Sequence, residues 1–115
     1  MVYVTREQFE DLVAEAIDTL PPDLAELIDN VAIFVEDDPP PGQHLLGLYQ
    51  GIPLTSRGFF YSGALPDRIT IYRRPVMGIT STPDEVREQV RITVVHEIAH
   101  HFGIGDERLH ELGYG

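Results

Sequence analysis

A long helix is predicted by residues 82–102, which read TPDEVREQVRITVVHEIAHHF. Thr82 is a suitable N-cap, Pro83 fits the first helical turn, and Glu85 completes a capping box. Gly103 follows the helix and suits the left-handed conformation that often closes one. At 1.5 Å per residue the helical residues 83–102 span roughly 30 Å. We therefore expect the rest of the fold to pack against this helix.

Other helices and strands are predicted in separate blocks before and after it. Thr5 and Gln8 form a capping box, residues with helical spacing follow, and Pro21 and Pro22 end that first helix. Shorter helices are expected at residues 23–29 and 106–112, strands at 31–35, 59–61 and 68–73, and an extended piece at 45–49. Segregated elements favour an α+β fold with a small twisted sheet, mixed or mostly antiparallel, on the long helix.

The first helix has two chemically different faces. Its apolar positions recur at the spacing of a buried helical face: Phe9, Leu12, Val13, Ala16, Ile17 and Leu20. The acidic residues between Glu7 and Asp18 fall on the remaining positions, so we expect them to face solvent.

The composition limits the classes of function. With 115 residues, the chain is expected to form one domain, residues 1–115. The formal net charge of −11 opposes binding to nucleic acid and to anionic membranes. Cysteine is absent, so any metal site must use histidine and carboxylates. No export signal or membrane span is recognisable, so we expect a cytoplasmic location.

The end of the long helix carries a zinc-binding pattern. His96 and His100 are four residues apart and share one helical face, where two imidazoles can bind one zinc ion. Glu97 adjoins the first ligand in the H-E-x-x-H arrangement and is the candidate general base. A turn at Gly103 can bring Asp106 back towards the histidines as a third ligand.

These residues carry a resemblance to a known family. His96-Glu97-x-x-His100-x-x-Gly103-x-x-Asp106 resembles the extended motif of the Asp-zincin metallopeptidases, and the short chain resembles their minimal bacterial members, the mini-zincins. Residues 39–41 and 46–54 also resemble that group. The resemblance implies a minimal zincin-like fold, zinc bound by the two histidines and the aspartate, Glu97 as catalytic base, and a peptide or protein substrate.

In zincins an edge strand above the active-site helix pairs with extended substrate. By this resemblance, residues 69–73 are the candidate strand. The competing interpretation is an ordinary sheet strand, with the side chains of Arg73 and Arg74 at its end pointing to solvent. His110 falls four residues after Asp106 and could assist the transition state, support a ligand or bind the metal itself. His101 points about 100° away from His100 around the helix and is not expected to bind.

Two other functions remain open. The spacing of positions 96, 100 and 106 also fits a zinc-dependent ribonuclease with a His-x3-His-x5-His pattern, although Glu97, the aspartate at 106 and the acidic charge oppose that reading. A zinc-stabilised binding module without turnover is the second. A structural zinc is closed by four protein ligands, so His110 as a fourth ligand would distinguish it.

Overall fold

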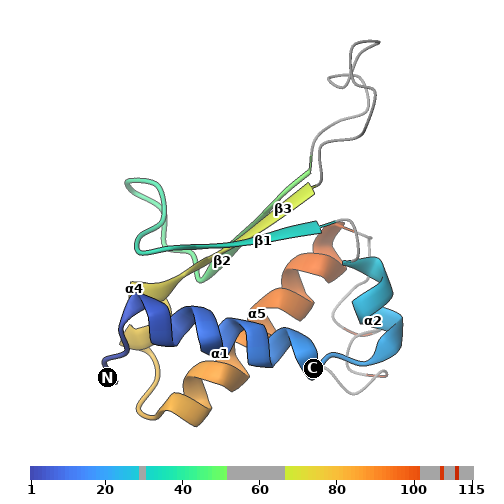
Figure 1. Cartoon of the computed structure of the whole chain (residues 1–115). Coiled ribbons are helices and arrows are strands. Elements are labelled where there is room, and N and C mark those ends of the chain that lie inside the picture. Colours follow the sequence, from blue (N-terminus) through green and yellow to red (C-terminus); the bar gives the residue numbers. More distant parts are fainter. Residues whose placement is uncertain (29–30, 52–66, 102–106, 108–110, 112–115) are drawn as a thin grey trace.

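The computed structural model describes residues 1–28, 31–51, 67–101, Glu107 and Glu111, with the backbone alone described at Leu27, His100 and His101. The elements in these ranges are α1 (Arg6–Asp18), α2 (Pro22–Leu27), β1 (Val31–Glu36), β2 (Gly47–Gln50), β3 (Asp67–Tyr72), α4 (Arg73–Gly78) and α5 (Pro83–His101). The strands form a sheet on one side, and α1, α2 and α5 lie on the other (Figure 1). The expected α+β fold is confirmed.

The sheet is mixed, and its central strand is β3. The strand order is β1-β3-β2, with β1 parallel and β2 antiparallel to β3. Ile69 pairs with Ile33 on one side and Tyr49 on the other, so both edges of β3 are used. The expectation that residues 69–73 form a free edge strand for substrate is therefore wrong. Within the described part of the chain, β1 and β2 form the edges.

The two long helices begin where the sequence predicts. Thr5 Oγ1 accepts from the Gln8 N–H at 3.1 Å, and Gln8 Oε1 accepts from the Thr5 N–H at 2.9 Å, which completes a capping box. Thr82 Oγ1 accepts from the Glu85 N–H at 3.1 Å. The contact of the Glu85 carboxylate differs from the predicted capping box, because this carboxylate accepts from the N–H of Ser81, one residue before the cap.

The core lies between the sheet and the paired helices α1 and α5. Helix α1 contributes Phe9, Val13 and Ala16, and the inner face of β3 contributes the fully buried Ile69 and Ile71. From α5 come Val86, Val90, Val94, Val95, Ile98 and Ala99. The predicted apolar face of the first helix is confirmed, with Leu12 and Ile17 half-buried at its margin.

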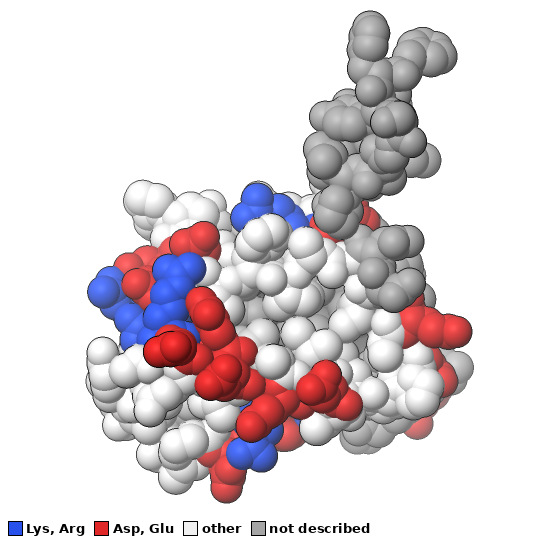
Figure 2. All heavy atoms as spheres, in the orientation of Figure 1, with Lys and Arg blue, Asp and Glu red and all other residues white. Residues whose placement is uncertain are grey.

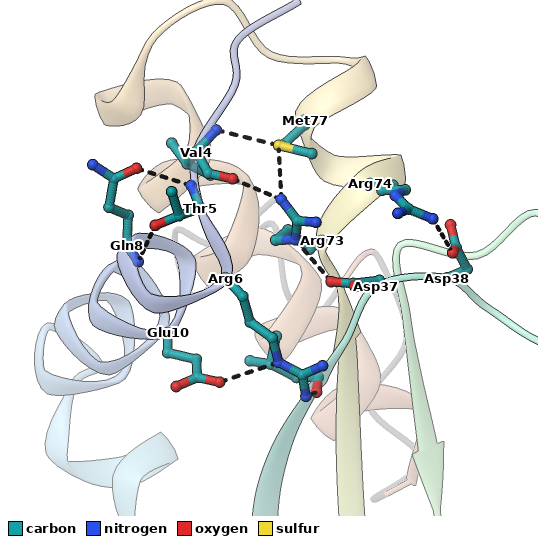
Figure 3. A network of polar contacts seen from close by, with 11 residues as sticks. Val4, Thr5, Arg6, Gln8, Glu10, Asp37, Asp38, Arg73, Arg74 and Met77 are labelled. Carbon is teal, nitrogen blue, oxygen red and sulfur yellow. Dashed lines mark hydrogen bonds and ion pairs between the residues drawn. The ribbon is translucent and has the colours of Figure 1, made fainter.

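Helix α4 was not expected, and it changes the position of one arginine. Arg73 is the first residue of α4, where Pro75 is tolerated because the first turn of a helix leaves its N–H groups unbonded. The Arg73 side chain is buried: its Nε binds Asp37 Oδ1 at 2.8 Å and its Nη1 donates to the Val4 carbonyl at 2.7 Å (Figure 3). The expectation of a solvent-facing side chain holds for Arg74 but is wrong for Arg73.

Some of the remaining predicted elements are present with shifted ends, and others lie outside the described residues. The second helix begins at Pro22, and strands form at residues 31–36, 47–50 and 67–72. The predicted strand at 59–61 lies outside the described residues. So does the helix at 106–112 except for Glu107 and Glu111, which are helical. None of the described helices is long and apolar enough to span a membrane.

The surface of α1 is acidic, as its sequence predicts. Glu7, Glu10, Asp11, Glu15 and Asp18 are all exposed. In Figure 2 acidic side chains form a band across the face along which α1 runs in Figure 1, with arginines beside it.

Candidate active site

The candidate site lies along the C-terminal half of α5, where the sequence places its motif. His96 and Glu97 are both half-buried. The backbone of His100 continues the same helix, which ends at His101. Positions four apart on a helix share a face, so positions 96 and 100 meet the geometric requirement for two ligands of one metal ion. Thus the helix that positions the candidate base also positions two of the three candidate ligands.

A groove runs between α5 and the chain leading into β2. Its volume is about 350 Å³. One wall is formed by His44, Leu45, Leu46 and Gly47, and the other by Gln89, Ile92, Thr93, His96 and Glu97. The lining includes the aliphatic side chains of Leu45, Leu46 and Ile92, and His96 and Glu97 both belong to the helical wall. The groove therefore joins an apolar surface to the residues expected to carry chemistry.

A larger hollow elsewhere on the molecule is a weaker candidate. It has a volume of about 440 Å³ and lies between α1 and β1. Its lining residues are Arg6, Glu10, Val13, Ala14, Ile17, Ile33, Phe34, Val35 and Glu36. No histidine is among these residues, and Arg6 donates to the Val35 carbonyl at 2.6 Å across it. The smaller groove is therefore the better site, because it alone of the two contains residues of the motif.

Glu97 makes a direct contact with the sheet. Its Oε1 accepts a hydrogen bond from the backbone N–H of Tyr49, at 3.1 Å. Tyr49 belongs to β2, and its hydroxyl donates to Asp67 Oδ2 on β3 at 2.9 Å. The candidate base is therefore tied to an edge strand that is itself anchored to the centre of the sheet.

The direction of the Tyr49 N–H follows from the register of β2 on β3. The Tyr72 N–H donates to the Leu46 carbonyl at 2.9 Å, so residues 46 and 72 form a hydrogen-bonded pair. Such pairs alternate along an antiparallel ladder. Leu48 therefore bonds towards β3, whereas the N–H and C=O groups of Gly47 and Tyr49 point away from it. The outward edge of β2 faces α5 and the groove.

The electrostatic setting includes one perturbed group. Burial raises the pKa of Tyr72, the positive charge of Arg68 opposes that rise, and the negative charges of Glu36 and Glu97 add to it. Tyr72 therefore stays a neutral phenol across the physiological range.

The complete metal site is not within the described residues. Among those residues, no group of three or more histidine, aspartate or glutamate side chains could hold a metal ion. The His100 side chain, Asp106 and His110 all fall outside them. The three-ligand set thus stays a prediction, as does the role of His110.

Sequence reasoning missed Gly47 and Tyr49 as parts of the site. The stretch from residue 46 to 54 was included in the family resemblance, but no role was given to its residues. Only the pairing of β2 with β3 and its approach to α5 reveals them, and both contacts join segments far apart in sequence.

Comparisons with known proteins identify a family and a similar solved structure. The sequence model of a family described as zincin-like metallopeptidase matches residues 28–115, a range that includes β2 and the whole motif. No curated protein matches the chain. Among solved structures the chain is similar to a conserved hypothetical protein from Thermus thermophilus, with 27% identity and a TM-score of 0.61. The similarity covers 86% of this chain and 94% of the other.

Proposed function

Because the chain belongs to the zincin-like metallopeptidase family, we propose that it hydrolyses peptide bonds with one zinc ion and Glu97 as general base. The observation that carries the proposal is the position of Glu97. Its carboxylate lies on the wall of the groove, beside His96 and against the outward edge of β2. A general base that lies beside a candidate zinc ligand and next to the edge of β2 is suited to act on an extended peptide that pairs with that strand.

The donor set fits zinc. His96 and His100 occupy successive turns of one regular helix, and His96 is half-buried at the groove. Two imidazoles and a carboxylate, here Asp106, form a known type of catalytic zinc site that leaves one position open. When bound, zinc would lower the pKa of a water molecule and polarise a carbonyl group.

Glu97 supplies the proton transfers. Its carboxylate takes a proton from the attacking water and later gives that proton to the leaving amine. Since the Tyr49 N–H holds Oε1 at the strand edge, the carboxylate is oriented before substrate arrives. The apolar residues Leu46 and Ile92 line the same groove next to the carboxylate.

The substrate is an extended peptide that pairs with β2. The outward N–H and C=O groups of this strand can add main-chain hydrogen bonds to a peptide, a common mode of peptide recognition. Strand β2 replaces residues 69–73 in this role, because β3 is paired on both sides.

The two alternatives fit less well. A binding module without turnover needs no base, whereas Glu97 is held at the groove beside a ligand position. A ribonuclease must attract a polyanion, but the chain carries a net charge of −11 and α1 exposes five carboxylates. We therefore place the peptidase first and the binding module second.

The test is cleavage of a broad peptide library by zinc-loaded protein, read by mass spectrometry. Wild type is compared with Glu97→Gln, and Glu88→Gln on the same helix is the matched control, because Glu88 is exposed and pairs with Arg91 away from the groove. Zinc content is measured in all three proteins. Cleavage by wild type and Glu88→Gln, but not by Glu97→Gln with its zinc retained, supports the peptidase. Absence of cleavage by all three, with zinc bound, favours the binding module.

A further inference from the structure

The outward edge of β2 has two positions with different surroundings. The Tyr49 N–H is bonded to Glu97 Oε1. Gly47 points its N–H and C=O the same way, and it lines the groove, whereas Tyr49 does not. No other described residue is hydrogen-bonded to the outward groups of Gly47. Tyr49 thus contacts the candidate base, whereas Gly47 lines the groove in which a peptide would lie.

From this geometry we infer a division of labour along the strand: Tyr49 is a positioning residue that holds Glu97 through its backbone N–H, and Gly47 binds the substrate main chain. The inference rests on the proposed peptidase function and deepens it. It assigns a role to two residues outside the zinc motif and sets the register of the bound peptide, which pairs with β2 at Gly47.

The bond to Glu97 is of the stronger kind. A hydrogen bond between an amide and a carboxylate is charge-assisted and is about twice as strong as a neutral one. A glutamate side chain has three rotatable bonds, so without such a contact its carboxylate would sample several positions. The bond from the Tyr49 N–H favours the position next to the strand. A base held in one place transfers protons more efficiently than one that must first be oriented.

The strand that provides this bond is itself firmly held. An added Cβ at Gly47 would lie 2.7 Å from Thr93 Cγ2, so the strand packs directly on α5 at that point. Two residues later the Tyr49 hydroxyl binds Asp67 on the central strand. These two contacts hold β2 against α5 and against β3, and they therefore limit the distance between the edge of β2 and Glu97.

The same bond limits where substrate can pair. An N–H that already donates to Glu97 cannot also donate fully to a peptide carbonyl. Gly47 offers a donor and an acceptor together, which is the pair that a strand needs from its neighbour. The peptide therefore takes its two main-chain bonds at Gly47 and leaves the Tyr49 N–H to the base.

Replacement of a single backbone amide by an ester tests each half of the inference in the full chain. An α-hydroxy acid analogue at position 49 or 47 removes that N–H and keeps the side chain. Each ester also weakens one carbonyl that faces β3, that of Leu48 or Leu46, so the two variants control for each other. Zinc content and unfolding midpoint are measured for both.

The two esters are expected to differ in kinetics. The ester at 49 should lower kcat roughly 10- to 100-fold, as for loss of a charge-assisted hydrogen bond, with KM nearly unchanged. The ester at 47 should raise KM roughly 3- to 10-fold, as for loss of a neutral hydrogen bond, with kcat nearly unchanged. Equal effects of the two esters on kcat and KM would overturn the inference.

Two further measurements do not depend on turnover. In 1H–15N NMR the Tyr49 amide should exchange slowly with solvent, and Glu97→Ala should speed its exchange while leaving the exchange of the Leu48 amide unaffected.

Binding of a peptide hydroxamate to the zinc-loaded protein should weaken with the ester at 47 but not at 49. If this binding pattern holds while no peptide is cleaved, the peptidase function fails and the assignment of the strand edge stands. If both esters weaken binding equally, the assignment fails even where cleavage is observed.

Discussion

Gly47 packs against Thr93 so closely that no side chain fits between β2 and α5. A Cβ at residue 47 would lie 2.7 Å from Thr93 Cγ2, 3.1 Å from the Thr70 carbonyl oxygen and 3.2 Å from Ile71 Cδ1. The edge strand can approach the helix to this extent only because the residue is glycine. That approach places the neighbouring Tyr49 N–H within hydrogen-bond distance of Glu97.

Gly47→Ala should therefore destabilise the protein and weaken its catalysis. Overpacking of this kind typically costs about 1–3 kcal/mol, since all three neighbouring atoms belong to the backbone or to a buried side chain. The free energy of unfolding is measured by urea titration. Gly78→Ala is the control, because nothing lies within 4 Å of an added Cβ there. That control should be neutral or stabilise by roughly 0.4–1 kcal/mol. Equal stability of Gly47→Ala and wild type would show that the strand can move away from the helix.

The ion pair of Asp37 with Arg73 should make stability depend on acid pH. The hydrogen bond from Arg73 lowers the pKa of Asp37 below its ordinary value of 3.8, an effect that outweighs partial burial. A folded-state pKa below the unfolded one means that the ionised carboxylate favours folding. This contribution is present above pH 3.8 and is lost as the pH falls through the folded-state pKa.

Asp37→Asn should accordingly lower the Tm at pH 7, and the difference from wild type should narrow below pH 3.8. The neighbouring Asp38→Asn is a matched control, because Asp38 and Arg74 form an exposed pair that contributes little (Figure 3). Thermal unfolding followed by circular dichroism at several pH values provides the measurement. If the difference in Tm between Asp37→Asn and wild type stays constant from pH 7 to pH 2.5, the pair of Asp37 with Arg73 is not its source.

The proposed zinc ligands should be distinguishable from His101, their neighbour on the same helix. His96→Ala, His100→Ala and Asp106→Ala should each lose zinc, because removal of one of three ligands leaves an incomplete site. His101→Ala should retain it, since the next helical position points about 100° away. Zinc content after dialysis, measured by mass spectrometry, separates these outcomes. Retention of zinc by Asp106→Ala with loss by His110→Ala would reassign the third ligand.

The local features of this fold could be predicted from sequence because their causes lie within a few residues. Thr5 with Gln8 and Thr82 with Glu85 start the two long helices, and each signal spans three positions. The motif on α5 is of the same kind, since helical spacing alone brings positions 96 and 100 to one face.

The features that could not be predicted depend on contacts between distant segments. The central position of β3 follows from its pairing with both β1 and β2, which no local pattern specifies. Arg73 is buried because Asp37, 36 residues earlier, pairs with it. The contact of Glu97 with Tyr49 spans 48 residues. For α4, the proline at position 75 was an available signal, because proline is favoured in a first helical turn.

The most direct test of the central claim is the kcat/KM of Glu97→Gln relative to wild type, on one cleaved peptide and at equal zinc content. A general base contributes about 10²- to 10⁴-fold to rate, so we predict a decrease of that size with zinc retained. The glutamine keeps the size of the side chain and an oxygen that can still accept from Tyr49, so the main loss is the capacity for proton transfer. An unchanged kcat/KM in a variant that retains its zinc would contradict the assignment of Glu97 as the base.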